Sequence, residues 1–242
     1  MIAIPCARGA IASSGASVSP FSPTSIAGLK LWLKADAGVT EAGGVVTSWA
    51  DQSGEGNDAG NGIPPELLTN QINGLPAIQF SEGAWLQIPE NNIGNSGNIT
   101  VFVVIDYTAG GILLNKGDGA TFEGTEWEMA PQNGFGYVKN DEGDYSWNVV
   151  AFTPSGLSLI TMITTSGVTE LFNNNSSVGT SSNATPVNAI SQYIGIGGGG
   201  TTGAAQSPLN ARIAEIIIYD SALSIQNREA VENYLNSKYN IY

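Results

Sequence analysis

Histidine is absent from the 242-residue chain, and cysteine occurs once. Without histidine the chain cannot assemble a Ser-His-Asp or Cys-His catalytic centre, nor a zinc site ligated by imidazole. The single Cys6 allows neither an intrachain disulfide nor a cysteine-cluster zinc site. Because Cys6 lies in an apolar stretch, we interpret it as an inert small hydrophobic side chain rather than a reactive thiol.

Charge is also scarce. Charged residues make up 12% of the chain, about half the usual fraction. The net charge is −13 with only eight basic residues, so little is present to neutralise phosphates. Nucleic acid and anionic membrane surfaces are therefore excluded as expected partners. No apolar run approaches the roughly 18 residues of a membrane span, and the apolar start lacks the basic region of a secretory signal peptide.

Residues 1–25 lack any sustained hydrophobic period and are rich in Ser, Gly, Ala and Pro. Such a segment cannot bury enough surface to offset the entropy of ordering it. We interpret it as an extended N-terminal tail that anchors the protein on other copies of itself or on another protein. This predicts a homo-oligomer or a larger assembly, with one domain at residues 26–242.

The 31 glycines and 11 prolines punctuate short segments that are rich in β-branched and aromatic residues. This pattern predicts strands joined by turns, and therefore an all-β sandwich or jelly roll. The predicted strands are 29–35, 75–80, 84–89, 99–107, 111–117, 135–140, 157–165, 168–174, 192–198 and 211–220.

One helix is predicted at residues 224–240, with Ser224 as its N-cap. Apolar residues at helical spacing predict a stripe that packs on the sandwich as a lid, rather than a partner-binding helix. The stripe contains Val231, Tyr234, Leu235 and Tyr239. The polar positions expected to lie opposite are Asn227, Arg228, Glu232 and Asn236.

Several stretches carry a family resemblance in order along the chain. They are GLKLWLKAD (28–36), VTSWADQSGEGNDA (46–59), GLPAIQF (74–80), AWLQIP (84–89), TVFVVIDY (100–107), LLNKGD (113–118) and the closing segment 213–241. Everything except the N-terminal tail resembles the concanavalin A-like lectin/glucanase superfamily, in its laminin G-like branch of phage structural proteins and secreted bacterial proteins. The resemblance implies a two-sheet antiparallel jelly roll, with Trp32 and Trp49 in the core, but it implies no activity, because this fold hosts many functions.

The stretch SWADQSGEGNDAG (48–60) looks like a calcium loop, with oxygen-bearing side chains at alternate positions. Its twelfth position is Gly62, where an EF-hand needs a bidentate glutamate, so an EF-hand is excluded. We favour a structural turn in which Asp51 and Ser53 accept hydrogen bonds from local backbone N–H groups. Some laminin G-like domains bind calcium through Asp and Asn at the rim. The resemblance therefore keeps three residues as candidate calcium ligands: Asp51, Asn57 and Asp58.

Carbohydrate binding needs aromatic rings beside amide and carboxylate groups. The stretch 126–147 combines such residues, and Trp85 lies beside the sequence SEG. The candidate carbohydrate-binding residues are Trp127, Tyr145, Trp147 and Trp85, and a role in the core is the alternative for each. Tyr137 is expected in the core.

One pair of carboxylates, Glu126 and Glu128, is the candidate for a glycosidase-type catalytic site. Glu126 and Glu128 share a strand face if the segment is extended. The longer Glu-x-Asp-x-x-Glu pattern of the glucanases is missing, and so are the basic and histidine motifs of the lyases. We therefore expect no enzyme and no catalytic residue.

The leading interpretation is a non-enzymatic structural or adhesion protein of a phage virion, as a capsid decoration or a tail or fibre component, whose loops contact glycans. The first alternative is a secreted carbohydrate-binding module with an extracellular location. The second is a glycoside hydrolase or lyase that uses Glu126 and Glu128.

Overall fold

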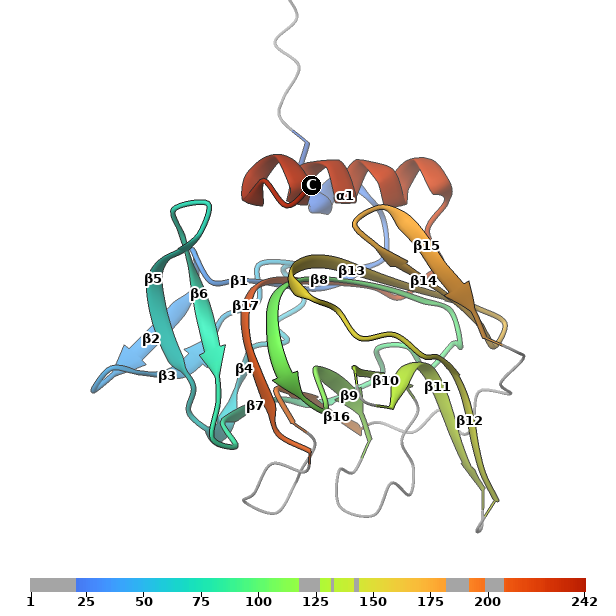
Figure 1. Ribbon diagram of the computed structural model, residues 1–242, viewed down its shortest axis with the longest axis horizontal. Helices are drawn as coiled ribbons and strands as arrows, with labels where there is room; N and C mark the ends of the chain where they lie inside the picture. The colour runs from blue at the N-terminus through green and yellow to red at the C-terminus, as the bar shows by residue number, and fades with distance from the viewer. Residues whose placement is uncertain (1–20, 118–126, 132, 142–143, 182–191, 199–206) are drawn as a thin grey trace, which may run out of the picture.

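The computed structural model describes residues 21–117, 127–131, 133–141, 144–181, 192–198 and 207–242. Within these residues the chain forms two antiparallel sheets packed face to face, with one α-helix lying over one of them (Figure 1). Every strand pairing in the described residues is antiparallel. The predicted all-β sandwich with a C-terminal helix is confirmed.

The sheet beneath the helix, named here the helix-side sheet, is centred on β8 (Ile99–Gly110) and β17 (Leu209–Tyr219). On one side, β17 pairs with β1 (Leu29–Lys34) and β6 (Leu75–Phe80), and β6 pairs with β5 (Glu66–Ile72). On the other side, β8 is followed in order by β13 (Gly156–Thr165), β14 (Val168–Asn173) and β15 (Ser176–Thr180).

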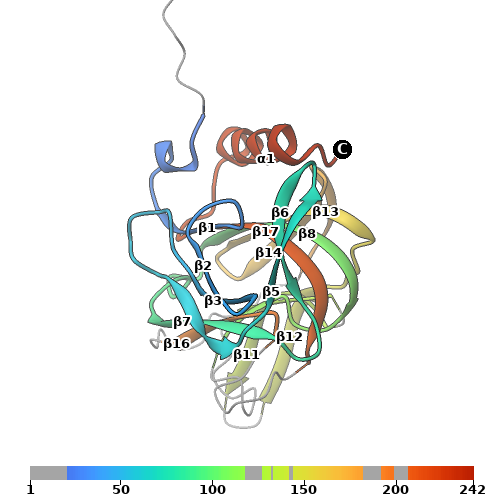
Figure 2. The same ribbon diagram turned by 90° about the vertical axis from the view of Figure 1, so that its left-hand side faces the viewer.

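The second sheet, named here the far sheet, lies on the side of the sandwich away from the helix (Figure 1). Its order is β4 (Ala59–Ile63), β7 (Trp85–Asn91), β16 (Gln192–Ile196), β9 (Leu114–Lys116), β10 (Trp127–Ala130), β11 (Gly134–Asp141) and β12 (Asp144–Val150). The hairpin of β2 (Val39–Ala42) and β3 (Val45–Trp49) joins the two sheets, because β3 pairs with both β4 and β5 (Figure 2).

Two hydrophobic cores follow from this layering. Inward residues of both sheets form the first core, including Val101, Val103 and Ile105 of β8. The alternate residues of the same strand, Phe102 and Val104, pack under the helix. Strand β8 is therefore apolar along most of its length because both of its faces are buried. In the far sheet alternate residues join the first core, such as Trp127 and Met129 of β10, although Glu128 between them is buried as well.

Helix α1 (Ile225–Tyr239) begins at the predicted cap, where Asn227 N–H donates to Ser224 Oγ over 3.3 Å, and it ends at Asn240 in a left-handed conformation. Val231, Leu235 and Tyr239 pack on the helix-side sheet, so the predicted lid is confirmed. No described helix combines the length and apolar content that a membrane crossing requires.

The polar side of the helix departs from the prediction. Arg228 and Glu232 are buried rather than facing solvent. The Arg228 guanidinium donates to Glu232 Oε2 over 2.7 Å, and Thr161 Oγ1 of β13 donates to Glu232 Oε1 over 2.8 Å. The prediction was wrong for these two residues: Arg228 is three positions before Val231 and Glu232 three before Leu235, so helical spacing places both beside the apolar stripe. Their charges are accommodated there because β13 supplies Thr161 to Glu232 and β14 supplies the Phe172 ring, 4.1 Å from the Arg228 guanidinium.

Residues 21–25 also differ from the prediction, because they belong to the folded domain. Phe21 packs on Tyr234 of the helix with ring centroids 6.1 Å apart, and Pro23 lies in the short helix η1 (Pro23–Ser25). The buried Tyr219 hydroxyl donates to the Pro23 carbonyl over 2.9 Å. Residues 21–25 of the predicted tail therefore pack on the domain, and its remaining residues, 1–20, lie outside the described part of the chain.

Candidate functional site

One residue from each of six neighbouring strands aligns in a row across the far sheet. The register joins Gln87, Gly195, Asn115, Glu128, Gly136 and Val149. Their chain neighbours Leu86, Ile196 and Leu114 are buried in the core between the sheets. Because side chains alternate along a strand, the row lies on the opposite face, which is named here the outer face.

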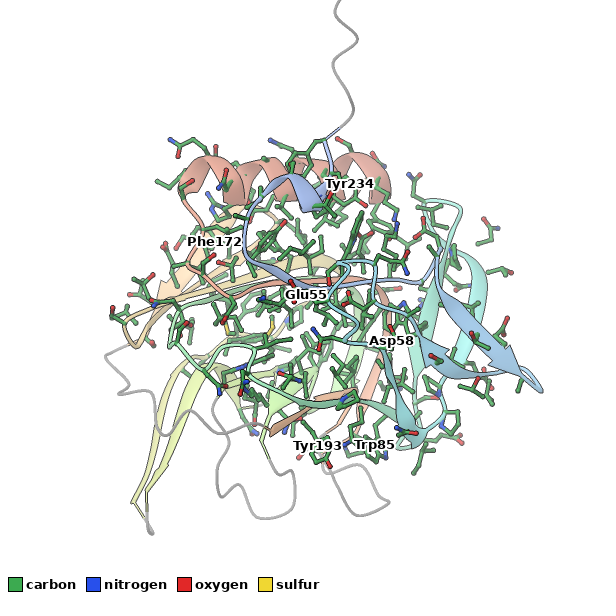
Figure 3. All side chains as sticks on the ribbon, turned by 180° about the vertical axis from the view of Figure 1, so that it is seen from behind. Glu55, Asp58, Trp85, Phe172, Tyr193 and Tyr234 are labelled. Atoms are coloured by element: carbon green, nitrogen blue, oxygen red, sulfur yellow. The ribbon has the colours of Figure 1, made fainter. Side chains whose placement is uncertain are left out.

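Aromatic residues share this face. Trp85 and Tyr193 are each two positions from a member of the row, and both lie at the end of the molecule away from the helix (Figure 3). Tyr193 is half-buried. On β12, Trp147 and Tyr145 stand two and four positions from Val149, paired with Val138 and Asn140. The backbone register therefore places them on the same face of the strand, while their side chains lie outside the described part.

The outer face concentrates polar atoms that have no partner. Four buried side-chain polar atoms lack a hydrogen bond in the described residues, and three belong to this face: Trp85 Nε1, Asn115 Oδ1 and Glu128 Oε2. An unsatisfied buried polar group costs about 1–3 kcal/mol. With one donor and two acceptors, this face matches a ligand that both donates and accepts hydrogen bonds.

Glu128 is 1% exposed, and its other oxygen, Oε1, accepts from Asn133 Nδ2 over 3.1 Å. Burial raises the pKa of the Glu128 carboxyl, and the hydrogen bond from Asn133 opposes this effect. The carboxyl therefore keeps its proton to a higher pH than an exposed glutamate, and in that form it can donate as well as accept.

Gly195, between Gln87 and Asn115 in the row, allows a close approach. A Cβ atom at this position would lie 2.6 Å from Asn115 Oδ1 and 2.6 Å from the Gly198 carbonyl oxygen. Neither contact is tolerated by a real side chain, so the position requires glycine. The glycine leaves room for the Asn115 amide to lie over β16.

The structure separates the predicted carbohydrate-binding residues. The Trp127 side chain is fully buried in the core between the sheets, and its Nε1 donates to the Ile93 carbonyl over 3.5 Å. Trp127 is therefore corrected to a core residue, since its ring has no surface to offer a ligand. Trp85, Tyr145 and Trp147 come from distant parts of the chain, and the sheet brings their positions to the same outer face.

The predicted calcium loop is occupied by its own hydrogen bonds. Asp51 Oδ1 accepts from the Trp32 and Ser53 backbone N–H groups, and Oδ2 accepts from Ser53 Oγ and the Asn57 N–H, all within 3.0 Å. Asp58 Oδ1 accepts from the Asp51 N–H. Four donors already use the Asp51 carboxylate, which supports the structural turn over a calcium site. No group of three or more His, Cys, Asp or Glu that could hold a metal occurs in the described residues.

A polar cavity of about 380 Å³ lies beside this turn. Lys30 and Glu55 on its wall form an ion pair at 3.4 Å, and Asn57 is held there by donating to the Lys30 carbonyl over 2.8 Å. The lining residues are Lys30, Glu55, Asn57, Asn91, Asn92, Ile93 and Asp220. Of the predicted calcium ligands, only Asn57 reaches this cavity.

Sequence reasoning missed Gln87, Asn115 and Tyr193, and it considered Glu128 only for catalysis. A period-two pattern in AWLQIP, QYIGIG and LLNKG marks these residues as alternating with core positions. That pattern does not reveal that the strands become neighbours, because they are separated by up to about a hundred residues of sequence.

No protein-family model matches the chain, and no curated protein matches it in sequence. Solved structures do resemble its fold. Trypanosoma rangeli sialidase in complex with sialic acid aligns with a TM-score of 0.58 and 15% identity, covering 88% of this chain and 33% of the sialidase. The binding domain of botulinum neurotoxin DC in complex with SialylT gives a TM-score of 0.61 and 14% identity, covering 88% and 52%.

A third structure matches as a whole domain. Domain 4 of AbnA, a GH43 extracellular arabinanase from Geobacillus stearothermophilus, in complex with arabinotriose, has a TM-score of 0.58 and 10% identity over 84% of this chain and 97% of that domain. The chain thus spans about a third of the sialidase and half of the toxin domain. Identities this low show a shared β-sandwich fold and nothing finer.

Proposed function

We propose that this protein binds carbohydrate through the outer face of the far sheet and has no enzymatic activity. The single observation that carries the proposal is the gathering of three buried, unpartnered polar atoms, from Trp85, Asn115 and Glu128, on one face of one sheet. The fold is shared with domains solved with sialic acid, SialylT and arabinotriose, which supports a lectin-like role.

The chemistry of a sugar fits this arrangement. Each hydroxyl group both donates and accepts a hydrogen bond, so neighbouring hydroxyls can donate to Asn115 Oδ1 and Glu128 Oε2 while another accepts from Trp85 Nε1. Tyr193 supplies an aromatic ring at the edge of the row, and the aromatic positions 145 and 147 extend the same face along β12. Aromatic rings beside a few fixed polar groups are typical of small-ligand sites.

The proposal that the protein has no enzymatic activity is supported by the number of carboxyl groups in the row. Glycosidases use two carboxyl groups, about 5–5.5 Å apart in retaining enzymes and further apart in inverting ones. Glu128 is the only carboxylic residue that the register row contributes, and Glu126 lies outside the described residues. The row thus supplies one carboxyl group beside one amide, which favours sugar binding over cleavage of a glycosidic bond.

The wider role that we propose is adhesion within an assembly, as a structural component of a phage virion of the concanavalin A-like, laminin G-like type. Residues 1–20 would anchor the domain on other virion proteins or on copies of itself, and the outer face would point toward glycan. The composition of residues 1–20 and the packing of Phe21 against the domain support an anchor that ends where the fold begins.

A glycan array with the full chain tests the binding, followed by titration of the strongest hit against three variants. Tyr193→Ala, Gln87→Ala and Trp147→Ala should each weaken binding about tenfold, or about 1.4 kcal/mol. Tyr242→Ala is the control, because it removes an exposed tyrosine ring from the C-terminus. If no glycan binds, or if the control weakens binding as much as the three variants, the proposal is refuted.

Glu128 supplies the observation that favours the hydrolase alternative, because its raised pKa suits a general acid. Hydrolysis of a polysaccharide that disappears in Glu128→Gln would replace binding by catalysis as the function. A binding module secreted outside a virion gives the same array result. The two settings are distinguished by whether removal of residues 1–20 abolishes incorporation into particles.

A further inference from the structure

We infer that the outer face selects neutral glycans and rejects those that carry carboxylate, sulfate or phosphate groups. This inference rests on the proposed carbohydrate binding and names the ligand class for the same site. It follows from where the chain places its few cations and from Glu128, the one carboxylic residue of the row.

The basic residues are committed elsewhere. Of the eight in the chain, six have described side chains: Lys30, Lys34, Lys116, Arg212, Arg228 and Lys238. Four form ion pairs with carboxylates, namely Lys30 with Glu55, Arg212 with Asp106, Arg228 with Glu232 and Lys238 with Glu215. None of these four pairs lies on the outer face.

The other two described cations are also directed away from it. Lys34 lies over the Trp32 ring on the helix-side sheet, with its Nζ 4.2 Å from the ring centroid. Lys116 is fully buried and donates to the Ile93 carbonyl over 2.8 Å. Its register partner is the core residue Trp127, so Lys116 alternates with Asn115 and falls on the inner side of β9.

Two basic residues remain. The backbone register pairs Lys139 with Ser146, an odd number of positions from Gly136, so this position belongs to the opposite face of β11. Arg8 lies outside the described residues. Recognition of an anionic sugar relies on Arg or Lys, because charge-assisted hydrogen bonds are roughly twice as strong as neutral ones. The described outer face offers only amide, indole, phenol and carboxyl groups. Those groups serve hydroxyls, and to a sugar carboxylate they donate only neutral hydrogen bonds, with no cation to offset its charge.

Glu128 strengthens the rejection. Its carboxyl lies under the centre of the row, shielded from water, where a charge acts across several ångströms with little screening. An anionic ligand is therefore repelled by the ionised form even without direct contact. The net charge of −13 adds to this repulsion at longer range.

Val149 offers a way to reverse the selectivity. It belongs to the row, and its Cγ2 would lie 2.5 Å from a Cβ atom built on Gly134, so it stands on the outer face beside that glycine. Val149→Lys places a cation on the face. Val178 on β15 is 36% exposed at the edge of the helix-side sheet, and Val178→Lys adds the same charge away from the site.

The experiment uses the full chain on an array of matched pairs, each a neutral glycan and its sialylated or sulfated derivative, such as lactose and sialyllactose. The wild-type protein should bind the neutral member of each recognised pair at least about tenfold more tightly. Val149→Lys should reduce that preference by about tenfold or more, and Val178→Lys should leave it unchanged. Glu128→Gln should shift the preference in the same direction as Val149→Lys, and Glu41→Gln, at an exposed site on β2, should not.

The possible outcomes distinguish the selectivity for neutral glycans from the proposed carbohydrate binding on which it rests. If the wild-type protein prefers the acidic members, selectivity for neutral glycans is overturned while carbohydrate binding stands. The same holds if Val149→Lys changes the preference no more than Val178→Lys does. If no member of any pair binds, carbohydrate binding itself fails and the selectivity fails with it.

Discussion

Replacing Glu215 tests how the helix is held on the sandwich. This fully buried side chain of β17 accepts four hydrogen bonds at its two oxygens. Trp32 Nε1 and the Tyr234 hydroxyl donate to Oε1 over 2.5 and 3.0 Å, and the Tyr239 hydroxyl and Lys238 Nζ donate to Oε2, both over 2.8 Å. Three of the donors come from α1, so the Glu215 carboxyl joins the helix to the sheet.

Glu215→Leu keeps the approximate volume but leaves these donors without an acceptor. Trp32 and Tyr239 are buried, and each unsatisfied donor costs about 1–3 kcal/mol. Tyr234 reaches solvent, and Lys238 keeps its second ion pair with Asp36 at 3.0 Å, so both lose less. We expect a loss of about 3–5 kcal/mol in the free energy of unfolding, out of a typical total of about 5–15 kcal/mol.

Glu215→Gln separates the hydrogen bonds from the charge. With the new amide nitrogen in place of Oε2, the Tyr239 hydroxyl can rotate to accept a hydrogen bond from it. Only the ion pair with Lys238 is then lost, at a cost of about 1 kcal/mol. Urea denaturation followed by tryptophan fluorescence measures both values. A double-mutant cycle with Tyr239→Phe should show a coupling of at least about 0.5 kcal/mol. A loss below about 1 kcal/mol in Glu215→Leu would refute the reasoning.

Four further outcomes are expected. Removal of residues 1–20 should leave the melting temperature unchanged, whereas removal of 1–25 should lower stability by about 1–3 kcal/mol, because the buried Tyr219 hydroxyl loses its acceptor; equal melting curves would contradict this. Burial raises the pKa of Tyr219, Tyr234 and Tyr239, so stability is complete below their ordinary value of 10.0 and should fall as pH rises beyond it, measured by alkaline titration of unfolding. The raised pKa of Glu128 should make stability decline as pH rises from 4.5, and Glu128→Gln should flatten that decline in denaturation at a series of pH values. Asp51→Ala should destabilise the domain by about 2–4 kcal/mol, and added calcium should not stabilise the wild-type protein if the turn is purely structural.

Local patterns in the sequence predicted much of the fold. The predicted strand at 75–80 matches β6, and the helix begins at its predicted cap, Ser224. These features depend on neighbours within a few residues, so a single sequence contains them. The strands that prediction missed, such as β4 with the sequence AGNGI and β15 with SSVGT, are poor in apolar and β-branched residues. They are strands because their backbones complete the pairing of adjacent strands.

The candidate site was less predictable. The sequence around Trp85 and Trp127 does not show which of them faces the core. Trp85 lies on the outer face because it is two residues from Gln87, its strand's member of the row. Trp127 lies in the core because it is next to Glu128, the member from its own strand. A shift of one residue moves a side chain to the opposite face, and only pairing with distant strands sets that shift.

The sequence by itself determined the chemistry that is available and excluded: no imidazole, no disulfide, few cations, and many short strands with one capped helix. Those properties are sums over residues or interactions within a few positions. Only the tertiary structure decided that Trp85, Asn115 and Glu128 share a face, that Glu215 of β17 is buried under the helix, and that the Asp51 carboxylate already accepts four hydrogen bonds. Such outcomes depend on contacts between segments far apart in the chain, whose pairing and burial no local pattern specifies.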